Sequence, residues 1–219
     1  MIESGEFGRV LNVRGLYGKS RMIPFSGGCR SERARAGRGI PLDQGIHMLD
    51  MLRHFVGDFA EVRSFVSNDF WSHDVEDNAY AIMRTNDGVV ATIHSIATQW
   101  RHRFRLEVTL QEAFLELTGI LSDSKSYGEE KLVVVHREEE SVTGAFRERT
   151  TSYRNDNSWQ DEVDEFARLI LDDAPVINGN SADAAAVMAM VYRIYHADER
   201  WRAAFDIPDP SDTARSASR

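Results

Sequence analysis

Apolar residues in this chain alternate with polar ones in several short runs, and this pattern predicts a sheet. Such alternation is typical of strands with one buried and one exposed face. Two of the runs flank Asn86-Asp87-Gly88, which favours a tight hairpin turn. Most runs follow one another through short polar turns without a helix between them, so an open, mainly antiparallel sheet is expected. The predicted strands span residues 9–17, 61–67, 79–85, 89–98, 103–110, 113–118, 132–137 and 146–153.

Helical spacing of apolar residues begins after Pro41 and predicts a helix that packs on the sheet. Asp43 stands where an N-cap is expected, and Gly57 stands where the helix should end, just after Val56. A long loop is expected before this helix, because residues 18–39 are rich in glycine, serine and arginine and show little periodicity.

Two further helices are predicted near the C-terminal end and complete an α+β domain with its helices on one face of the sheet. One begins at Ser158 with a capping-box-like sequence, and an alanine-rich one begins at Ser181. Two prolines and small polar residues near the C-terminus indicate a loose tail. No repeat or long linker divides the sequence, so we expect one domain over residues 1–205 and a flexible tail over 206–219.

The helix after Pro41 combines a mostly apolar circumference with a polar stripe, formed by Asp43, His47, Asp50 and His54. At about 100° per residue, these four positions fall within an arc of roughly 60°. A carboxylate four residues before a histidine stabilises the imidazolium and orients the ring, and histidine itself titrates near neutral pH. The pattern therefore suits proton transfer in a cleft. The same spacing also fits a plain N-cap and a solvent-exposed Asp–His pair.

Composition and charge exclude several classes of function. Apolar residues make up 42% of the 219 residues and charged residues 28%, as in ordinary globular proteins. The net charge of −9 argues against a nucleic-acid partner, because binding a phosphate backbone requires a basic face. The single cysteine, Cys29, excludes an intrachain disulfide and fits a reducing compartment. The sequence shows no leader-like N-terminus and no long apolar run, so we expect a cytoplasmic protein without a membrane partner.

The most informative motif lies at residues 37–50 and reads GRGIPLDQGIHMLD. It resembles the G-G-x-x-x-D-x-G-x-H-x-x-D signature of the Gfo/Idh/MocA oxidoreductases, which include glucose–fructose oxidoreductase-like and inositol dehydrogenase-like enzymes. Residues 75–79, VEDNA, resemble the strand start of that family, and residues 4–10 resemble the turn that leads into its second domain. The resemblance extends over nearly the whole chain, from about residue 2 to about residue 200.

This resemblance implies a fold, a reaction and a set of site residues. Members have a Rossmann domain followed by a substrate and oligomerisation domain on an open antiparallel sheet, and the chain resembles the second domain. The implied reaction is hydride transfer between a nicotinamide cofactor, NAD or NADP, and a sugar, a polyol or cyclitol, or a nucleotide-linked sugar. His47 would be the general base that removes the hydroxyl proton, and Asp43 would orient and polarise that hydroxyl. Arg30 lies in a loop where the family often has Trp-Arg and is a candidate substrate contact.

The Rossmann half of such an enzyme is not recognisable in this sequence. No G-x-G-x-x-G follows a predicted strand, and Glu130-Lys131-Leu132 does not match the family's Glu-Lys-Pro segment, because it lies after the signature helix. We therefore expect the cofactor to be bound mainly by a domain outside this chain, and the isolated chain to be inactive. The lysine that the resemblance places near the reacting hydroxyl is expected to be missing too. The resemblance further implies a homo-oligomer formed through the open face of the sheet.

Two other interpretations stay open at this point. The chain could be a non-catalytic oligomerisation or ligand-binding module derived from this family and kept for its sheet surface. Alternatively, the polar stripe could join the patch His73-Asp74-Val75-Glu76-Asp77 as the metal site of a hydrolase or isomerase. The spacing matches no zinc motif, so no metal ligand is assigned. The segment Trp100-Arg101-His102-Arg103 is interpreted as a hairpin turn without a catalytic role.

Overall fold

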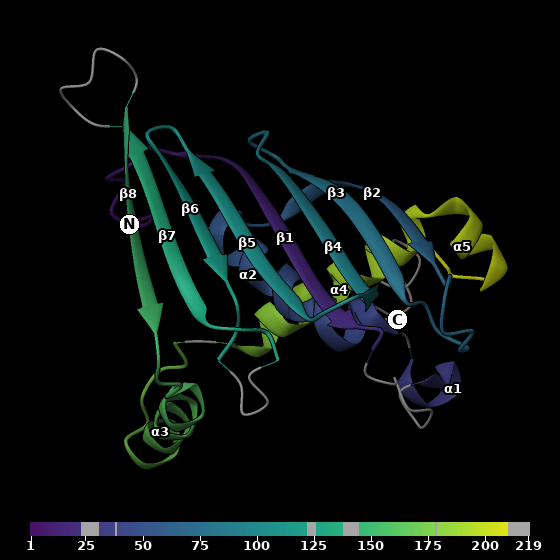
Figure 1. The fold of residues 1–219 in the computed structure, drawn as a ribbon. Helices are drawn as coiled ribbons and strands as arrows, with labels where there is room; N and C mark the ends of the chain where they lie inside the picture. Colours follow the sequence, from purple (N-terminus) through teal and green to yellow (C-terminus); the bar gives the residue numbers. More distant parts are fainter. Residues whose placement is uncertain (23–30, 38, 122–125, 138–144, 178, 210–219) are drawn as a thin grey trace.

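The computed structural model of the protein describes residues 1–22, 31–37, 39–121, 126–137, 145–177 and 179–209. This part of the chain forms an open eight-stranded sheet with helices behind one face, which confirms the expected α+β fold (Figure 1). The strand order is β2-β3-β4-β1-β5-β6-β7-β8. The strands are β1 Val10–Ser20, β2 Phe59–Ser67, β3 Asn78–Thr85, β4 Val90–Gln99, β5 Arg103–Leu110, β6 Ala113–Thr118, β7 Glu130–Arg137 and β8 Phe146–Tyr153.

The strand β1 lies in the middle of the sheet, between β4 and β5. Its residue Gly15 pairs with Ile93 of β4 in parallel orientation and with Leu106 of β5 in antiparallel orientation. The other neighbouring pairs of the described sheet are antiparallel. The expectation of a mainly antiparallel sheet is therefore confirmed. The parallel β1–β4 pair results from the crossover through a helix and two strands that separates these strands in sequence.

Two long helices cover one face of the sheet, α2 (Ile46–Val56) and α4 (Ser181–Ala197). In Figure 1 both lie behind the strands, with α2 against β1 and β4, and α4 against β2. A π-helical turn, η2 (Pro41–Gly45), leads directly into α2. The remaining helices of the described residues are α1 (Arg33–Ala36), α3 (Ser158–Leu171) and α5 (Glu199–Ala204).

The segment between β1 and α2 differs from the long loop expected for residues 18–39. The strand β1 continues to Ser20, and α1 forms a short helix within the expected loop. The prediction that Asp43 is an N-cap is wrong, because helical backbone conformation already begins at Ile40 and Asp43 lies inside the π-helical turn. The backbone N–H of Asp43 donates to the carbonyl of Gly39 at 3.0 Å, so it is already part of the helical hydrogen bonding.

The core lies between the inner face of the sheet and helices α2 and α4. Val13 and Gly15 alternate toward the helices along β1, and Met48 of α2 packs against this strand. Gly15 allows the close contact, because an added Cβ would overlap the Met48 side chain. Burial of each large apolar side chain stabilises such a core by roughly 1.5–3 kcal/mol. Large, fully buried apolar side chains are Ile40, Met48, Leu49, Leu52, Met83, Leu106, Ile194 and Tyr195.

The outer face of the sheet has no helix over it in the described part of the chain (Figure 1). Phe65, Tyr80 and Ile82 are 77%, 47% and 58% exposed there. The helix α3 lies beyond the end of β8, and its side chains Trp159 and Phe166 are also well exposed.

The last described residues pack on α4, since Ile207 is buried and the hydroxyl of Tyr192 donates to the carbonyl of Pro208 at 2.8 Å. The rest of the expected tail, residues 210–219, lies outside the described residues. None of the helices described above is long and apolar enough to cross a membrane.

Candidate functional site

Lys19 and Asp43 form an ion pair where the end of β1 meets η2. The Nζ atom of Lys19 lies 2.8 Å from Oδ2 of Asp43, and each side chain is 25% exposed. Asp43 reaches this position because η2 packs its turn against the inner face of the sheet, where the odd-numbered residues of β1 point. The pair is therefore anchored by two elements and still accessible to solvent.

The sequence analysis expected no lysine near Asp43, and the structure places Lys19 there. The family resemblance places its lysine in a different segment, and Lys19 lies outside that motif. The missed signal is the alternation of β1 itself. Val13, Gly15 and Tyr17 face the helices, and Lys19 continues that series. A charged residue on the inward face of a strand requires a partner, because a buried unpaired charge is costly.

A cluster of aromatic rings lies next to the ion pair. The ring of Tyr17 contacts Tyr127 edge-on at a centroid distance of 5.5 Å and Phe104 at 5.4 Å. The ring of His102 lies 4.7 Å from that of Tyr127. The side-chain amide of Gln44, the residue after the candidate carboxylate, donates to the Tyr127 hydroxyl at 2.9 Å. Tyr127, which precedes β7, thus contacts both Tyr17 of β1 and Gln44 of η2.

Burial sets the protonation of this cluster. It raises the pKa of Tyr127 to about 12. Burial also raises the pKa of Tyr17, and the negative charge of Asp43 raises it further. Both phenols are therefore protonated at neutral pH, and their hydroxyls are hydrogen-bonded to each other. Burial and the positive charge of Lys19 both lower the pKa of His102, so its ring is neutral near pH 7.

His47 stands on the first turn of α2, four residues after Asp43, and its side chain is exposed. Asp50 and His54 are exposed on the same helix, whereas Met48 is fully buried. His47, Asp50 and His54 thus lie on the outward side of the helix, whereas Asp43 is turned toward Lys19 of β1. No hydrogen bond or ion pair of the His47 side chain is present among the described residues, so the ring is available to a ligand.

The arginine-rich segment before α1 is only partly described. Arg30, the candidate substrate contact, and Cys29 both lie outside the described residues. Arg33 is described, and its guanidinium carbon lies 3.6 Å from the ring centroid of Phe205 at the end of α5. Its Nε atom lies 4.0 Å from a carboxylate oxygen of Asp74. Arg33 therefore packs within the fold and does not belong to the candidate site.

A buried carboxylate fixes the start of η2. Oε1 of Glu76 accepts hydrogen bonds from the N–H of Gly39 at 2.7 Å and from the hydroxyl of Tyr195. The N–H of Ile40 donates to the Glu76 carbonyl at 3.4 Å, and Pro41 has no N–H. A dinucleotide pyrophosphate is bound by free N–H groups at a helix N-terminus. Here the N–H groups of Gly39 and Ile40 already donate to Glu76. This helix start does not fit a nicotinamide cofactor's phosphates.

The carboxylate of the next residue, Asp77, also accepts hydrogen bonds from the backbone. Its oxygens accept hydrogen bonds from the N–H groups of Asp69, Phe70 and Trp71 at 2.8–3.0 Å. In the part of the chain that the structure describes, no group of three or more histidine, cysteine, aspartate or glutamate side chains could hold a metal ion. The alternative of a metal-dependent hydrolase or isomerase therefore gains no support from the described residues.

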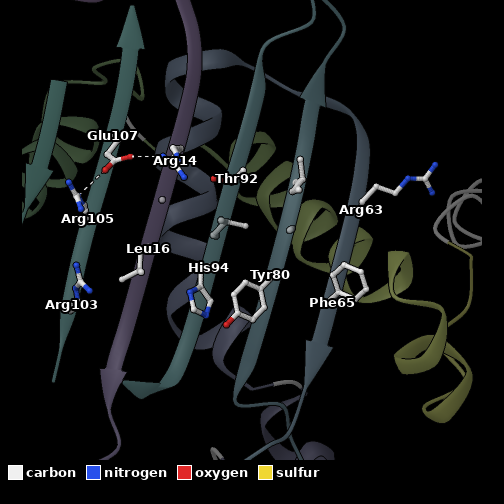
Figure 2. A pocket seen from close by; sticks show the side chains of 14 residues that line it. Arg14, Leu16, Arg63, Phe65, Tyr80, Thr92, His94, Arg103, Arg105 and Glu107 are labelled. Carbon is white, nitrogen blue, oxygen red and sulfur yellow. Dashed lines mark ion pairs between the residues drawn. The ribbon is translucent and has the colours of Figure 1, made fainter. Parts of the chain in front are cut away.

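A separate hollow of about 510 Å³ lies on the outer face of the sheet, over the five strands from β2 to β5 (Figure 2). The rings of Tyr80 and His94 stack at 3.8 Å in its middle. Burial lowers the pKa of His94 to about 4, so this ring is neutral. Leu16 of β1 lines the hollow, whereas Tyr17 and Lys19 face the helices. The ion pair and this hollow are on opposite sides of the sheet.

Comparison with known proteins identifies the sequence family. Residues 1–116 match the family model described as the GFO/IDH/MocA C-terminal domain. A curated protein of Amycolatopsis mediterranei (strain S699), named "Putative UDP-kanosamine synthase oxidoreductase subunit", is 26% identical over 217 residues. The match covers 87% of this chain and 58% of that protein.

Solved structures show the same fold. Levoglucosan dehydrogenase in its apo form has a TM-score of 0.74 at 20% identity, covering 91% of this chain and 60% of that one. UDP-N-acetylglucosamine 3-dehydrogenase from Acidithiobacillus ferrooxidans has a TM-score of 0.70 at 19% identity, covering 91% and 58%. The chain thus spans a little over half the length of the relatives it matches.

Proposed function

Because the chain belongs to the GFO/IDH/MocA family, with that family's C-terminal domain at residues 1–116, we propose that it is the substrate-binding part of an NAD(P)-dependent oxidoreductase. The observation that carries the proposal is the Lys19–Asp43 ion pair, which stands one helical turn before the exposed ring of His47. A cation, a carboxylate and an imidazole at a solvent-accessible position are the groups needed to bind an alcohol and remove its proton.

The proposed substrate is a sugar, a polyol or cyclitol, or a nucleotide-linked sugar, which agrees with the dehydrogenases named above. In the oxidative direction, a carbinol group becomes a carbonyl. The ring of His47 takes the hydroxyl proton as general base, and Asp43 accepts a hydrogen bond from that hydroxyl and orients it. The ammonium of Lys19 stabilises negative charge that develops on the oxygen. A nicotinamide cofactor, NAD or NADP, held by another domain would supply the hydride acceptor for the same carbon.

The cofactor is proposed to be held mainly by a nucleotide-binding domain outside these 219 residues. The N–H groups of Gly39 and Ile40 are engaged with Glu76, which supports this assignment. The isolated chain is then expected to bind NADH weakly and to be inactive. Calorimetric titration of the chain with NADH tests the point, and a micromolar Kd would contradict it.

The role of His47 is tested in an enzyme that joins this chain to a nucleotide-binding domain. His47→Ala is expected to lower kcat by roughly 10²–10⁴-fold, as loss of a general base does. His54→Ala is the matched control, because His54 is exposed on the same helix two turns further along. A loss of less than about threefold for His47→Ala would remove this residue from the proposed mechanism.

The outer face of the sheet supports a second proposal, that the chain forms a homo-oligomer through this face. Phe65, Tyr80 and Ile82 are exposed apolar residues that line the hollow on this face. In the second candidate function, a non-catalytic module, this interface is the whole function. Phe65→Glu is expected to shift the sedimentation coefficient to that of a monomer, whereas Trp159→Glu on α3 should not. Unchanged self-association of Phe65→Glu would exclude this interface.

A further inference from the structure

A second hollow, of about 440 Å³, opens where β5 begins and β6 ends. It is lined by the turn before β5, by the ends of these two strands and by the residues that lead into β7. This position is at the same end of the sheet as Lys19, because β1 ends where its antiparallel neighbour β5 begins. The hollow includes the segment that the sequence analysis interpreted as a plain hairpin turn.

The hollow carries a surplus of positive charge. Three arginines and two glutamates line it. Glu116 is paired with Arg105, and Oε2 of Glu129 lies 2.7 Å from the ammonium of Lys131. Arg101 and Arg103 are exposed and make no ion pair or hydrogen bond through their side chains with any described residue. Two uncompensated guanidinium groups in a protein of net charge −9 form a local site for an anion.

The hollow shares a wall with the candidate site. Tyr127 and His102 line it, and the hydroxyl of Tyr127 accepts a hydrogen bond from Gln44, which follows Asp43 in η2. Nδ1 of His102 accepts a hydrogen bond from the N–H of Ser20 at 3.2 Å. Ser20 follows Lys19 and Gln44 follows Asp43. Each residue of the ion pair is therefore adjacent in sequence to a residue that contacts this wall. A ligand whose hydroxyl lies at the ion pair could extend an anionic group around the end of the sheet toward Arg101 and Arg103, although Arg103 also lines the hollow on the outer face.

From this arrangement we propose that the hollow binds the phosphate of a phosphorylated sugar, with Arg101 and Arg103 as its ligands. Arginine suits this role because its planar guanidinium donates two parallel hydrogen bonds to phosphate oxygens. The volume exceeds that of a single phosphate, so a sugar diphosphate fits as well as a monophosphate. The inference rests on the proposed function for the identity of the sugar, but the anion site itself stands on the charges and the hollow.

Calorimetry with this chain at low salt tests the proposal, using UDP-glucose, glucose 1-phosphate and glucose as probes. Both phosphorylated probes are expected to bind, and glucose to bind at least about tenfold more weakly. The variant Arg101→Ala/Arg103→Ala should lose at least about tenfold in affinity for the phosphorylated probes. Arg200→Ala on α5 is the matched control, because this exposed arginine belongs to a helix at the β2 side of the sheet.

Each outcome decides the proposal. Tighter binding of UDP-glucose than of glucose 1-phosphate assigns the hollow to a nucleotide-linked sugar, and equal binding assigns it to a simple sugar phosphate. Equal binding of all three probes, or unchanged affinity in the double variant, overturns the proposal. Affinity for the phosphorylated probes should also fall as salt is added, and this does not depend on any variant folding correctly.

The same variants separate this inference from the proposed reaction. In the enzyme with its nucleotide-binding domain, Arg101→Ala/Arg103→Ala should raise KM for the phosphorylated substrate and leave kcat within about twofold. His47→Ala should lower kcat and leave the difference in affinity between the phosphorylated probes and glucose unchanged. If His47→Ala retains full activity while the arginine variant still loses binding, the reaction assignment fails and the phosphate site stands.

Discussion

Lys19 and Asp43 lie 2.8 Å apart although they come from a strand end and a π-helical turn, and each is three-quarters buried. At this burial each charge needs the other, because a partly buried charge without a partner is costly. A quarter of each side chain stays exposed beside the half-buried phenols of Tyr17 and Tyr127, so the pair can also contact a ligand. Lys19 therefore gives the most direct test of the site.

Replacing Lys19 with methionine should lower kcat/KM at least about tenfold in the enzyme with its nucleotide-binding domain, because a charge near the developing alkoxide is lost. Lys19→Arg keeps the charge and should recover part of the activity. The matched control is Lys131→Met, which removes an exposed lysine paired with Glu129. Steady-state kinetics measure all three variants. Equal activity of Lys19→Met and Lys131→Met would show that the ion pair plays no part in the reaction.

Glu76→Leu should destabilise the fold, whereas Glu76→Gln should be tolerated. Leucine removes the acceptor for the Gly39 N–H and the Tyr195 hydroxyl, and each buried donor left without a partner costs about 1–3 kcal/mol. Glutamine keeps a side-chain oxygen at the same place. Burial raises the pKa of Glu76, so the site already disfavours a negative charge and a neutral amide suits it. Urea denaturation measures the free energy of unfolding, and equal losses for both variants would contradict this account.

Gly39→Ala should destabilise more than Gly15→Ala, although both glycines are in tight contacts. At Gly39 an added Cβ would overlap the backbone carbonyl of Glu76, which accepts a hydrogen bond from the Ile40 N–H and cannot shift cheaply. At Gly15 it would overlap the side chain of Met48, which has rotatable bonds and can repack. Overpacking usually lowers the free energy of unfolding by about 1–3 kcal/mol. The loss for Gly39→Ala should be the larger of the two. Thermal unfolding of both variants compares them directly.

Much of the fold could be predicted from the sequence because alternation and turn residues are local signals. The strands β5, β6 and β8 begin and end at the predicted residues 103–110, 113–118 and 146–153. The extension of β1 to Ser20 was not predicted, because Gly18 interrupts the strand pattern although Lys19 continues the inward series of Val13, Gly15 and Tyr17. Pairing with β4 and β5 on both sides holds this end of the strand in extended conformation.

The candidate site was predictable only where its residues lie together in a motif. Asp43 and His47 fall within one signature on one helix. Lys19 is 24 residues from its partner Asp43, and Tyr127 is 83 residues from its partner Gln44. Contacts of that kind depend on sheet order and register, which alternation alone does not determine. The π-helical turn was missed for a similar reason, since its start is set by the tertiary contact between Gly39 and Glu76.

His94 should make the protein less stable in mild acid. Its ring stacks on Tyr80, and its Nε2 atom is buried without a hydrogen-bond partner among the described residues. Burial lowers the pKa of His94 from 6.5 to about 4, so between these values the unfolded chain binds the proton and the folded chain does not. The stabilising contribution is therefore complete above pH 6.5 and is lost as pH falls toward 4.

The variant His94→Gln isolates this effect, because glutamine is polar but does not titrate. Between pH 7 and pH 4.5, the Tm of the unmodified protein should fall further than that of His94→Gln, by about 3 °C or more. His54→Gln is the control, since His54 is exposed on α2 and should leave the slope of Tm against pH unchanged. If His94→Gln and the unmodified protein lose Tm in parallel over this range, the buried ring is not the group whose protonation opposes folding.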